Sequence, residues 1–161
     1  MLFTTFATAQ NSYVSGGLFF QTEFDSEAMK GNATFEYGTF LKEKSAIGAA
    51  LKYQYEKDKN FEHVIIIEPY YRKYIWKNEK CGFFCDGVAG ITISLPQEGD
   101  TGLGFKIGLA PGFDCKLTEK MYFVSRFGFI GYYQPGDFDG KKYLRLSCDA
   151  TNITFGLRYQ F

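Results

Sequence analysis

Apolar and polar residues alternate without a break over the last eleven residues of the chain, Thr151 to Phe161. The apolar positions are Ile153, Phe155, Leu157, Tyr159 and Phe161. Successive side chains of a β-strand point to opposite faces, so this pattern predicts a strand with one apolar and one polar face. A closing strand of this kind, with an aromatic residue at its end, is typical of a membrane β-barrel.

Similar segments make up most of the remaining chain, and polar stretches separate them. The predicted strands before the closing one are Tyr13–Glu23, Ala33–Phe40, Ala46–Glu56, His63–Ile75, Cys81–Ser94, Gly102–Cys115 and Met121–Tyr133. With the closing strand they amount to about eight, and bacterial outer-membrane barrels have an even number of strands. Segments of roughly 10 to 14 residues have the length that a tilted strand needs to cross a bilayer.

The connections between these segments alternate in length. Short charged turns occupy Leu41–Ser45, Lys77–Lys80 and Lys116–Lys120, whereas the others are longer polar loops, of which Gln134–Leu144 is the longest. In outer-membrane barrels the short turns face the periplasm and the longer loops face outward. The sequence therefore predicts an all-β fold, an antiparallel up-and-down transmembrane β-barrel of about eight strands with both chain ends at the periplasmic side.

Composition agrees with this fold and excludes other classes of protein. The 161 residues are enough for one domain with its own core. The 18 Lys and Arg residues balance the 18 Asp and Glu residues, so no basic field is available to bind nucleic acid. No apolar run approaches the roughly 18 residues that a transmembrane helix needs.

The first nine residues carry a separate signal. Ala7-Thr8-Ala9 matches the small-residue cleavage site of a secretory signal peptide. This match predicts a signal-peptide remnant at residues 1–9 and a single barrel domain at residues 10–161. The apolar part is short and no basic region precedes it, so a frayed N-terminal segment is the alternative.

Several segments occur in an order that points to a family. They are G-x-F-L-K-E-K-S-A-I-G at Gly38–Gly48, E-P-Y-Y-R-K-Y at Glu68–Tyr74, A-P-G-F at Ala110–Phe113, and the final Phe161. With the closing strand, they resemble the outer-membrane β-barrel domain family, the porin-like small barrels akin to outer membrane protein X and the barrel domain of outer membrane protein A.

The resemblance implies a location and partners, but no single activity, because this fold carries many functions. It implies insertion among the lipids of the bacterial outer membrane. It also implies that the barrel-assembly machinery reads the end of the chain, with an assembly signal at Phe155, Leu157, Tyr159 and Phe161.

Charged residues within the predicted strands indicate which face of each strand points inward. A lipid-facing Arg or Lys at the bilayer midplane costs about 2 to 4 kcal/mol, so we expect these side chains inside the barrel. The predicted lumen residues are Glu36, Lys52, Glu68, Arg72, Asp86, Lys106, Asp114, Arg126 and Arg158. The same assignment directs toward lipid Ile47, Leu51, Ile65, Ile67, Ala89, Ile91, Phe105, Ile107, Leu109, Phe127, Phe129, Phe155 and Leu157.

An eight-stranded barrel is just wide enough for side chains to fill its interior. The four acids and five bases assigned to it would pair across that space, because buried charge is tolerated only when it is paired. We therefore predict a structural network of ion pairs in a side-chain-filled lumen. A narrow channel for small solutes is the alternative.

Four cysteines offer one candidate cross-link. Cys81 and Cys85 are on one face of a predicted strand but roughly 13 Å apart, too far to bind one metal ion. Cys81 is expected nearly opposite Cys115 when their strands pair, and an exported protein can form that disulfide. Free thiols acting as small apolar residues are equally compatible with the sequence.

Candidate catalytic and metal-binding residues are sparse. His63 is the only histidine, and no motif ties Ser125 or Ser147 to it as the nucleophile of a lipid-modifying barrel enzyme. Asp137 and Asp139 resemble a calcium loop but lack its later glutamate. We therefore predict no enzymatic activity, no cofactor and no metal site.

The function predicted from these features is broad. It is a small integral outer-membrane protein, monomeric or weakly associated. It contributes to envelope integrity or makes surface contacts through the Gln134–Leu144 loop, the longest exposed connection. A soluble lipocalin-like ligand-binding barrel is an alternative, in which apolar faces would point inward and charges outward. A lipid-modifying barrel enzyme is a further alternative.

Overall fold

The computed structural model describes residues 11–22, 29–57, 62–96, 101–134, 143–147 and 153–161. The strands are β1 (Ser12–Thr22), β2 (Met29–Lys42), β3 (Ser45–Lys57), β4 (Glu62–Lys77), β5 (Cys81–Pro96), β6 (Gly102–Lys116), β7 (Met121–Phe127), β8 (Phe129–Gln134), β9 (Tyr143–Ser147) and β10 (Ile153–Gln160). In this part of the chain no helix is long and apolar enough to cross a membrane.

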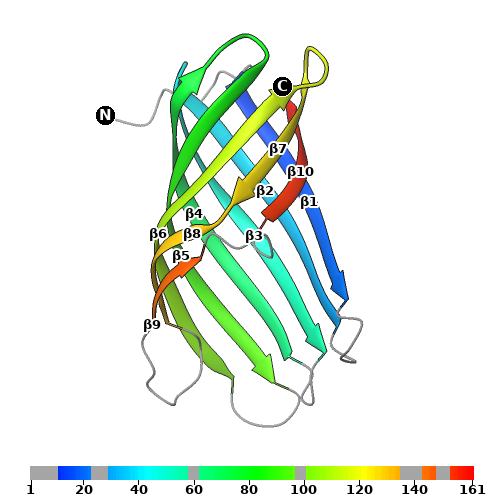
Figure 1. Ribbon diagram of the computed structural model, residues 1–161, viewed down its shortest axis with the longest axis vertical. Helices are drawn as coiled ribbons and strands as arrows, with labels where there is room; N and C mark the ends of the chain where they lie inside the picture. The colour runs from blue at the N-terminus through cyan, green and yellow to red at the C-terminus, as the bar shows by residue number, and fades with distance from the viewer. Residues whose placement is uncertain (1–10, 23–28, 58–61, 97–100, 135–142, 148–152) are drawn as a thin grey trace, which may run out of the picture.

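These segments form a closed, eight-stranded antiparallel barrel (Figure 1). Consecutive strands from β1 to β6 pair as hairpins, and β1 pairs with β10 to close the sheet. Two of the eight strands are interrupted. Gly128 separates β7 from β8, both of which pair with β6, and β9 and β10 pair with β8 and β7. The predicted all-β barrel is therefore confirmed.

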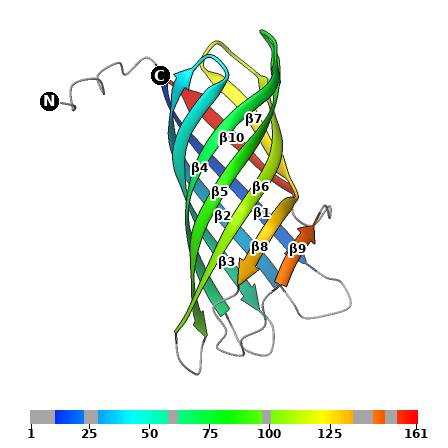
Figure 2. The ribbon, with the colours of Figure 1, turned by 90° about the vertical axis from the view of Figure 1, so that its left-hand side faces the viewer.

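The start of β1, the end of β10 and the short turns lie at the same end of the barrel (Figures 1 and 2). The Phe161 amide donates a hydrogen bond to the Ser12 carbonyl, and the Gln160 amide donates one to the Lys120 carbonyl. We call this the turn end, and the opposite end the loop end. The closing strand is thus tied at the turn end to both of its neighbours.

Two predicted loops are shorter than expected because strand pairing continues into them. The predicted loop before Ala33 is wrong from Met29 onward, since β2 pairs there with β1 and with β3. At the Gln134–Leu144 loop, Gln134 ends β8 and Tyr143 begins β9, while residues 135–142 lie outside the described residues. Residues 1–9, with the expected signal remnant, also lie outside.

The wall of the barrel is polar inside and apolar outside. Buried positions include six of the nine charged residues of the predicted lumen and a cluster of Tyr13, Ala46, Ala50, Tyr70, Val88 and Ala110. Aliphatic and aromatic side chains on the outer face are 47–57% exposed, namely Ile47, Leu51, Ile67, Ile91, Phe105, Ile107, Leu109, Phe155 and Leu157. Large apolar side chains thus surround a charged interior.

One predicted lipid-facing residue, Phe129, points inward instead. It packs against the buried cluster, and its ring centroid lies 5.4 Å from the Lys106 ammonium nitrogen. Gly128 has a φ of 81°, and the register against β6 shifts by one residue across it. An extra residue turns every following side chain to the opposite face, so a single alternation could not hold on both sides of Gly128.

We expect Gly128→Ala to lower the free energy of unfolding by about 1 to 2 kcal/mol, the cost of a left-handed conformation for a residue with a Cβ. Gly87→Ala is the matched control, because a Cβ there would have the Tyr71 carbonyl oxygen as its nearest neighbour at 3.8 Å. Urea unfolding of the detergent-folded barrel measures both. Equal midpoints for the two variants would contradict a strained bulge at Gly128.

Candidate functional site

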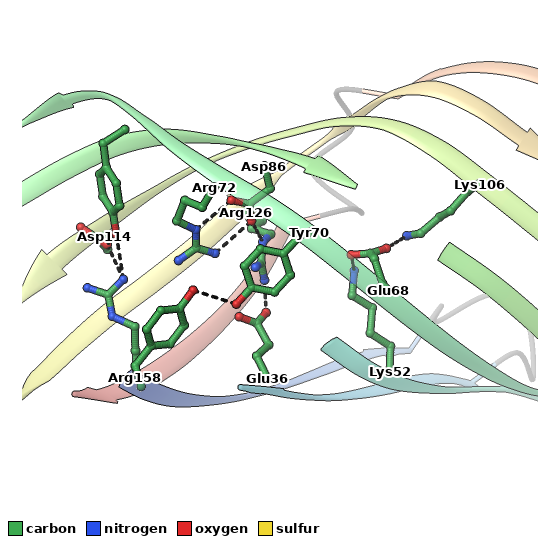
Figure 3. Close-up of polar contacts among 12 residues, drawn as sticks. Glu36, Lys52, Glu68, Tyr70, Arg72, Asp86, Lys106, Asp114, Arg126 and Arg158 are labelled. Carbon is green, nitrogen blue, oxygen red and sulfur yellow. Dashed lines mark hydrogen bonds and ion pairs between the residues drawn. The ribbon is translucent and has the colours of Figure 1, made fainter. Parts of the chain in front are cut away.

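The barrel interior contains all nine charged residues that the sequence assigned to the lumen. Glu36, Glu68, Arg72, Asp86, Asp114 and Arg158 are at most 2% exposed. The side chains of Lys52, Lys106 and Arg126 are 11–16% exposed. They come from seven strands, β2 to β7 and β10. They form three groups along the barrel axis (Figure 3).

The central group is a chain of alternating charges. Both oxygens of the Asp86 carboxylate accept hydrogen bonds from Arg72, at 2.8 and 2.9 Å. Arg126 Nε donates to the same carboxylate at 2.8 Å, and Arg126 Nη1 donates to Glu36. These contacts join β4, β5, β7 and β2. Charge-assisted, partly bidentate bonds of this kind are the strong class of hydrogen bond.

Aromatic side chains fill the space around these charges. The Arg72 guanidinium carbon lies 3.8 Å from the centroid of the Phe84 ring, which is a cation–π geometry. The hydroxyls of Tyr13 and Tyr70 are 2.8 Å apart and share a hydrogen bond. These aromatic residues were not predicted to lie inside the barrel. The sequence contains the information needed for Tyr70. It is two positions from Arg72, so the two side chains point to the same face of the strand.

A second group lies toward the turn end. Arg158 Nη1 on β10 donates to the Asp114 carboxylate at 2.7 Å and to the Tyr74 hydroxyl at 2.9 Å. The Tyr74 hydroxyl in turn donates to Asp114. The Arg158 guanidinium carbon lies 4.4 Å from the centroid of the Tyr122 ring. This group connects the closing strand to β4 and β6 through the interior.

The third group lies toward the loop end and shares one acid between two bases. Lys52 Nζ donates to Glu68 Oε1 at 2.6 Å, and Lys106 Nζ pairs with Glu68 Oε2. The three groups contain five bases and four acids, so together these nine residues carry one excess positive charge. The third group is where a base lacks its own acid.

In the described part of the chain the interior is closely packed around the central group and the group toward the turn end. Arg72 and Asp86 are 0% exposed and Tyr74 is 2% exposed. A continuous aqueous path beside them would expose these side chains. The geometry therefore matches an eight-stranded barrel that its own side chains fill.

Some buried polar atoms have no hydrogen-bond partner within the described part of the chain. They include Glu36 Oε2, Arg72 Nη1, Thr92 Oγ1 and Arg158 Nε. An unpaired buried polar atom costs free energy, so each one marks a position for a water or a ligand group.

Cys81 and Cys115 are directly opposite each other at the turn end of β5 and β6 and form a disulfide. Their Cα atoms are 4.1 Å apart. Cys85 is a free, half-buried thiol, and Cys148 lies outside the described residues.

His63 is near the start of β4, and its Nδ1 lies 2.6 Å from the Tyr53 hydroxyl. Its ring also packs against Tyr53 and Tyr55, with centroid distances of 5.9 and 5.3 Å. Ser125 is 1% exposed in β7 and is not among these contacts. Within the described residues, no three His, Cys, Asp or Glu side chains are grouped to hold a metal ion, and Asp137 and Asp139 lie outside them.

The closing strand has the predicted alternation. The side chains of Phe155, Leu157, Tyr159 and Phe161 are 40–51% exposed on the outer face. No protein-family model matches this chain, and no curated protein matches it either. Inferences about its function therefore rest on this geometry.

We expect Arg72→Ala to destabilise the barrel by about 3 to 5 kcal/mol, because removing one partner of a buried ion pair leaves an uncompensated charge. Lys73→Ala is the control, since Lys73 is the next residue on β4 and is exposed on the other face. Urea unfolding in detergent gives both values. A similar small loss for the two variants would show that the central group does not hold the barrel together.

Proposed function

We propose that this protein is a small integral barrel of the bacterial outer membrane with a structural role in the envelope or a role in surface contacts. The observation that supports the proposal is the polarity of the barrel wall. Monomeric soluble proteins rarely expose apolar patches larger than a few hundred Å². Here the exposed apolar side chains are distributed over most strands around the barrel, from Leu18 on β1 to Leu157 on β10.

The same polarity weighs against a soluble lipocalin-like barrel. Such a protein needs an apolar cavity for its ligand and a charged outer surface. In the described residues the ion pairs of the strands lie inside, and the outer face of the wall carries mainly aliphatic and aromatic residues. A lipid environment removes the cost of exposing that surface, whereas water does not.

The strand count and the lengths of the connections support a location in the bacterial outer membrane. Bacterial outer-membrane barrels have an even number of strands, short turns on the periplasmic side and longer loops outside. In this proposal the turn end faces the periplasm, and the barrel-assembly machinery reads the closing strand with its Phe155, Leu157, Tyr159 and Phe161. The barrel acts as a monomer, and the Gln134–Leu144 loop provides the surface for a partner.

The packed interior makes a structural role a better explanation than a channel. Solute passage would require the central group of Arg72, Asp86, Arg126 and Glu36 to separate. A lipid-modifying enzyme would require a nucleophile beside His63, whose contacts in the described residues are tyrosines.

We expect the protein to stay with membranes during an alkaline wash and to migrate differently on a gel before and after boiling. A closed barrel with a paired interior resists detergent unfolding until it is heated. Release into the soluble fraction, with no change of mobility on boiling, would rule out the membrane location.

We expect deletion of Phe161 to reduce the amount of folded barrel in the membrane strongly, because the assembly machinery would lose the end of its signal. The control is Phe161→Tyr, which keeps an aromatic ring at this position. The amount of folded barrel in each variant is measured as the gel band whose mobility changes on boiling. Equal amounts of folded barrel from the deletion and the control would contradict an assembly role for this residue.

A further inference from the structure

The closing seam between β1 and β10 separates part of the way along the barrel. The two strands pair from Tyr13 with Gln160 to Gly17 with Gly156. Both strands continue toward the loop end, β1 to Thr22 and β10 back to Ile153, but no pairing joins these continuations. Figure 1 shows β10 beginning away from β1. The described strands thus diverge just beyond the Gly17–Gly156 pair, and we call this point the fork.

An apolar groove lies on the outer face at the fork. It has a volume of about 700 Å³, and its lining includes Leu18, Phe35, Phe155 and Leu157. Gly16 forms part of its floor, and a Cβ placed there would meet nothing nearer than the Thr34 carbonyl oxygen at 3.9 Å. Gly16 has no side chain to occupy this part of the groove, so the groove stays open there.

A small polar cavity lies on the inner side of the same fork. It has a volume of about 20 Å³ and is lined by residues that include Ser15, Glu36 and Arg126. A volume of this size holds one water-sized group. Gly17, Thr34, Phe155 and Gly156 line both the cavity and the groove, so the two meet where the strands separate.

The carboxylate of Glu36, which lines this cavity, includes an unpartnered acceptor. Glu36 is 2% exposed, and its Oε2 has no hydrogen-bond partner among the described residues, although its Oε1 accepts from Arg126. The charges of the central group are already balanced, with two acids and two bases. A charged ligand group would break this balance and remain unpaired in a buried site. An uncharged hydroxyl donor satisfies Glu36 Oε2 without that cost.

We propose that the fork binds one molecule of a single-chain lipid with an uncharged, hydroxyl-bearing headgroup, of the monoacylglycerol type. The alkyl chain occupies the outer groove, and one headgroup hydroxyl enters the cavity and donates to Glu36 Oε2. This inference rests on the proposed membrane location, because the groove meets lipid only if the outer face does. It gives the surface of the barrel a specific lipid site in addition to its general contact with the bilayer.

The test uses barrel from alkali-washed membranes, reconstituted in nanodiscs of phosphatidylcholine with monolauroylglycerol and released for native mass spectrometry. We expect one monolauroylglycerol per barrel. Gly16→Leu places a side chain in the groove, and we expect about ten-fold or more weaker retention, since excluding a few methylene groups is enough for that change. Gly87→Leu is the control, because a Cβ there also makes only an ordinary van der Waals contact, with the Tyr71 carbonyl oxygen at 3.8 Å, on a different part of the wall.

Methyl laurate provides the test of the polar half, because it has the same chain and no hydroxyl donor. We expect it to bind about ten-fold less, since Glu36 Oε2 would stay unpaired. Equal retention of the two probes, or equal retention by the two leucine variants, would show ordinary contact with lipid and overturn the proposal.

The two proposals fail in different ways. Heat-modifiable, membrane-retained barrel that carries no monolauroylglycerol would overturn the lipid site alone and leave a water molecule as the partner of Glu36. Release of the protein by the alkaline wash would overturn the membrane location first, before any lipid is added.

Discussion

The shared carboxylate of Asp86 is the interaction on which the rest of the barrel depends. It accepts hydrogen bonds from Arg72 and from Arg126, and Arg126 extends the chain of charges to Glu36. A buried carboxylate with two guanidinium partners is stable only if the strands that carry them keep one register. A slip of one residue would turn a charge onto the apolar outer face. The ionic interior therefore specifies the pairing of the sheet as well as stabilising it.

Inward glycines make room for the aromatic rings that surround these charges. A Cβ on Gly38 would meet the Tyr13 ring at 2.5 Å, and a Cβ on Gly48 would meet the Tyr70 hydroxyl at 2.6 Å. The large rings need these positions to be empty. In return they exclude water from the ion pairs, which strengthens each electrostatic contact. The many glycines and the many aromatic residues of the chain are thus related, because the inward glycines leave space for the inward rings.

Alternation and charge were enough to predict the barrel, its strand order and its charged interior residues, because each strand offers only two faces and charge in the middle of a strand is costly on a face that meets lipid. The face of Phe129 was predicted wrongly, since only a backbone angle at Gly128 distinguishes a bulge from a continuous strand. The inward Tyr74 was missed because tyrosine suits an interface as well as an interior. The fork was not predictable, because it depends on where two distant strands stop pairing.

The position of the fork follows from how the interior holds the closing strand. Arg158 ties β10 to Asp114 and Tyr74 near the turn end, where the seam is paired. Toward the loop end the central group joins β2, β4, β5 and β7, and none of its members is on β1 or β10. The seam is therefore held from inside along only part of its length. Separation of the strands beyond Gly17 leaves the ion pairs intact, so the proposed lipid site would open the seam without weakening the contacts that keep the barrel folded.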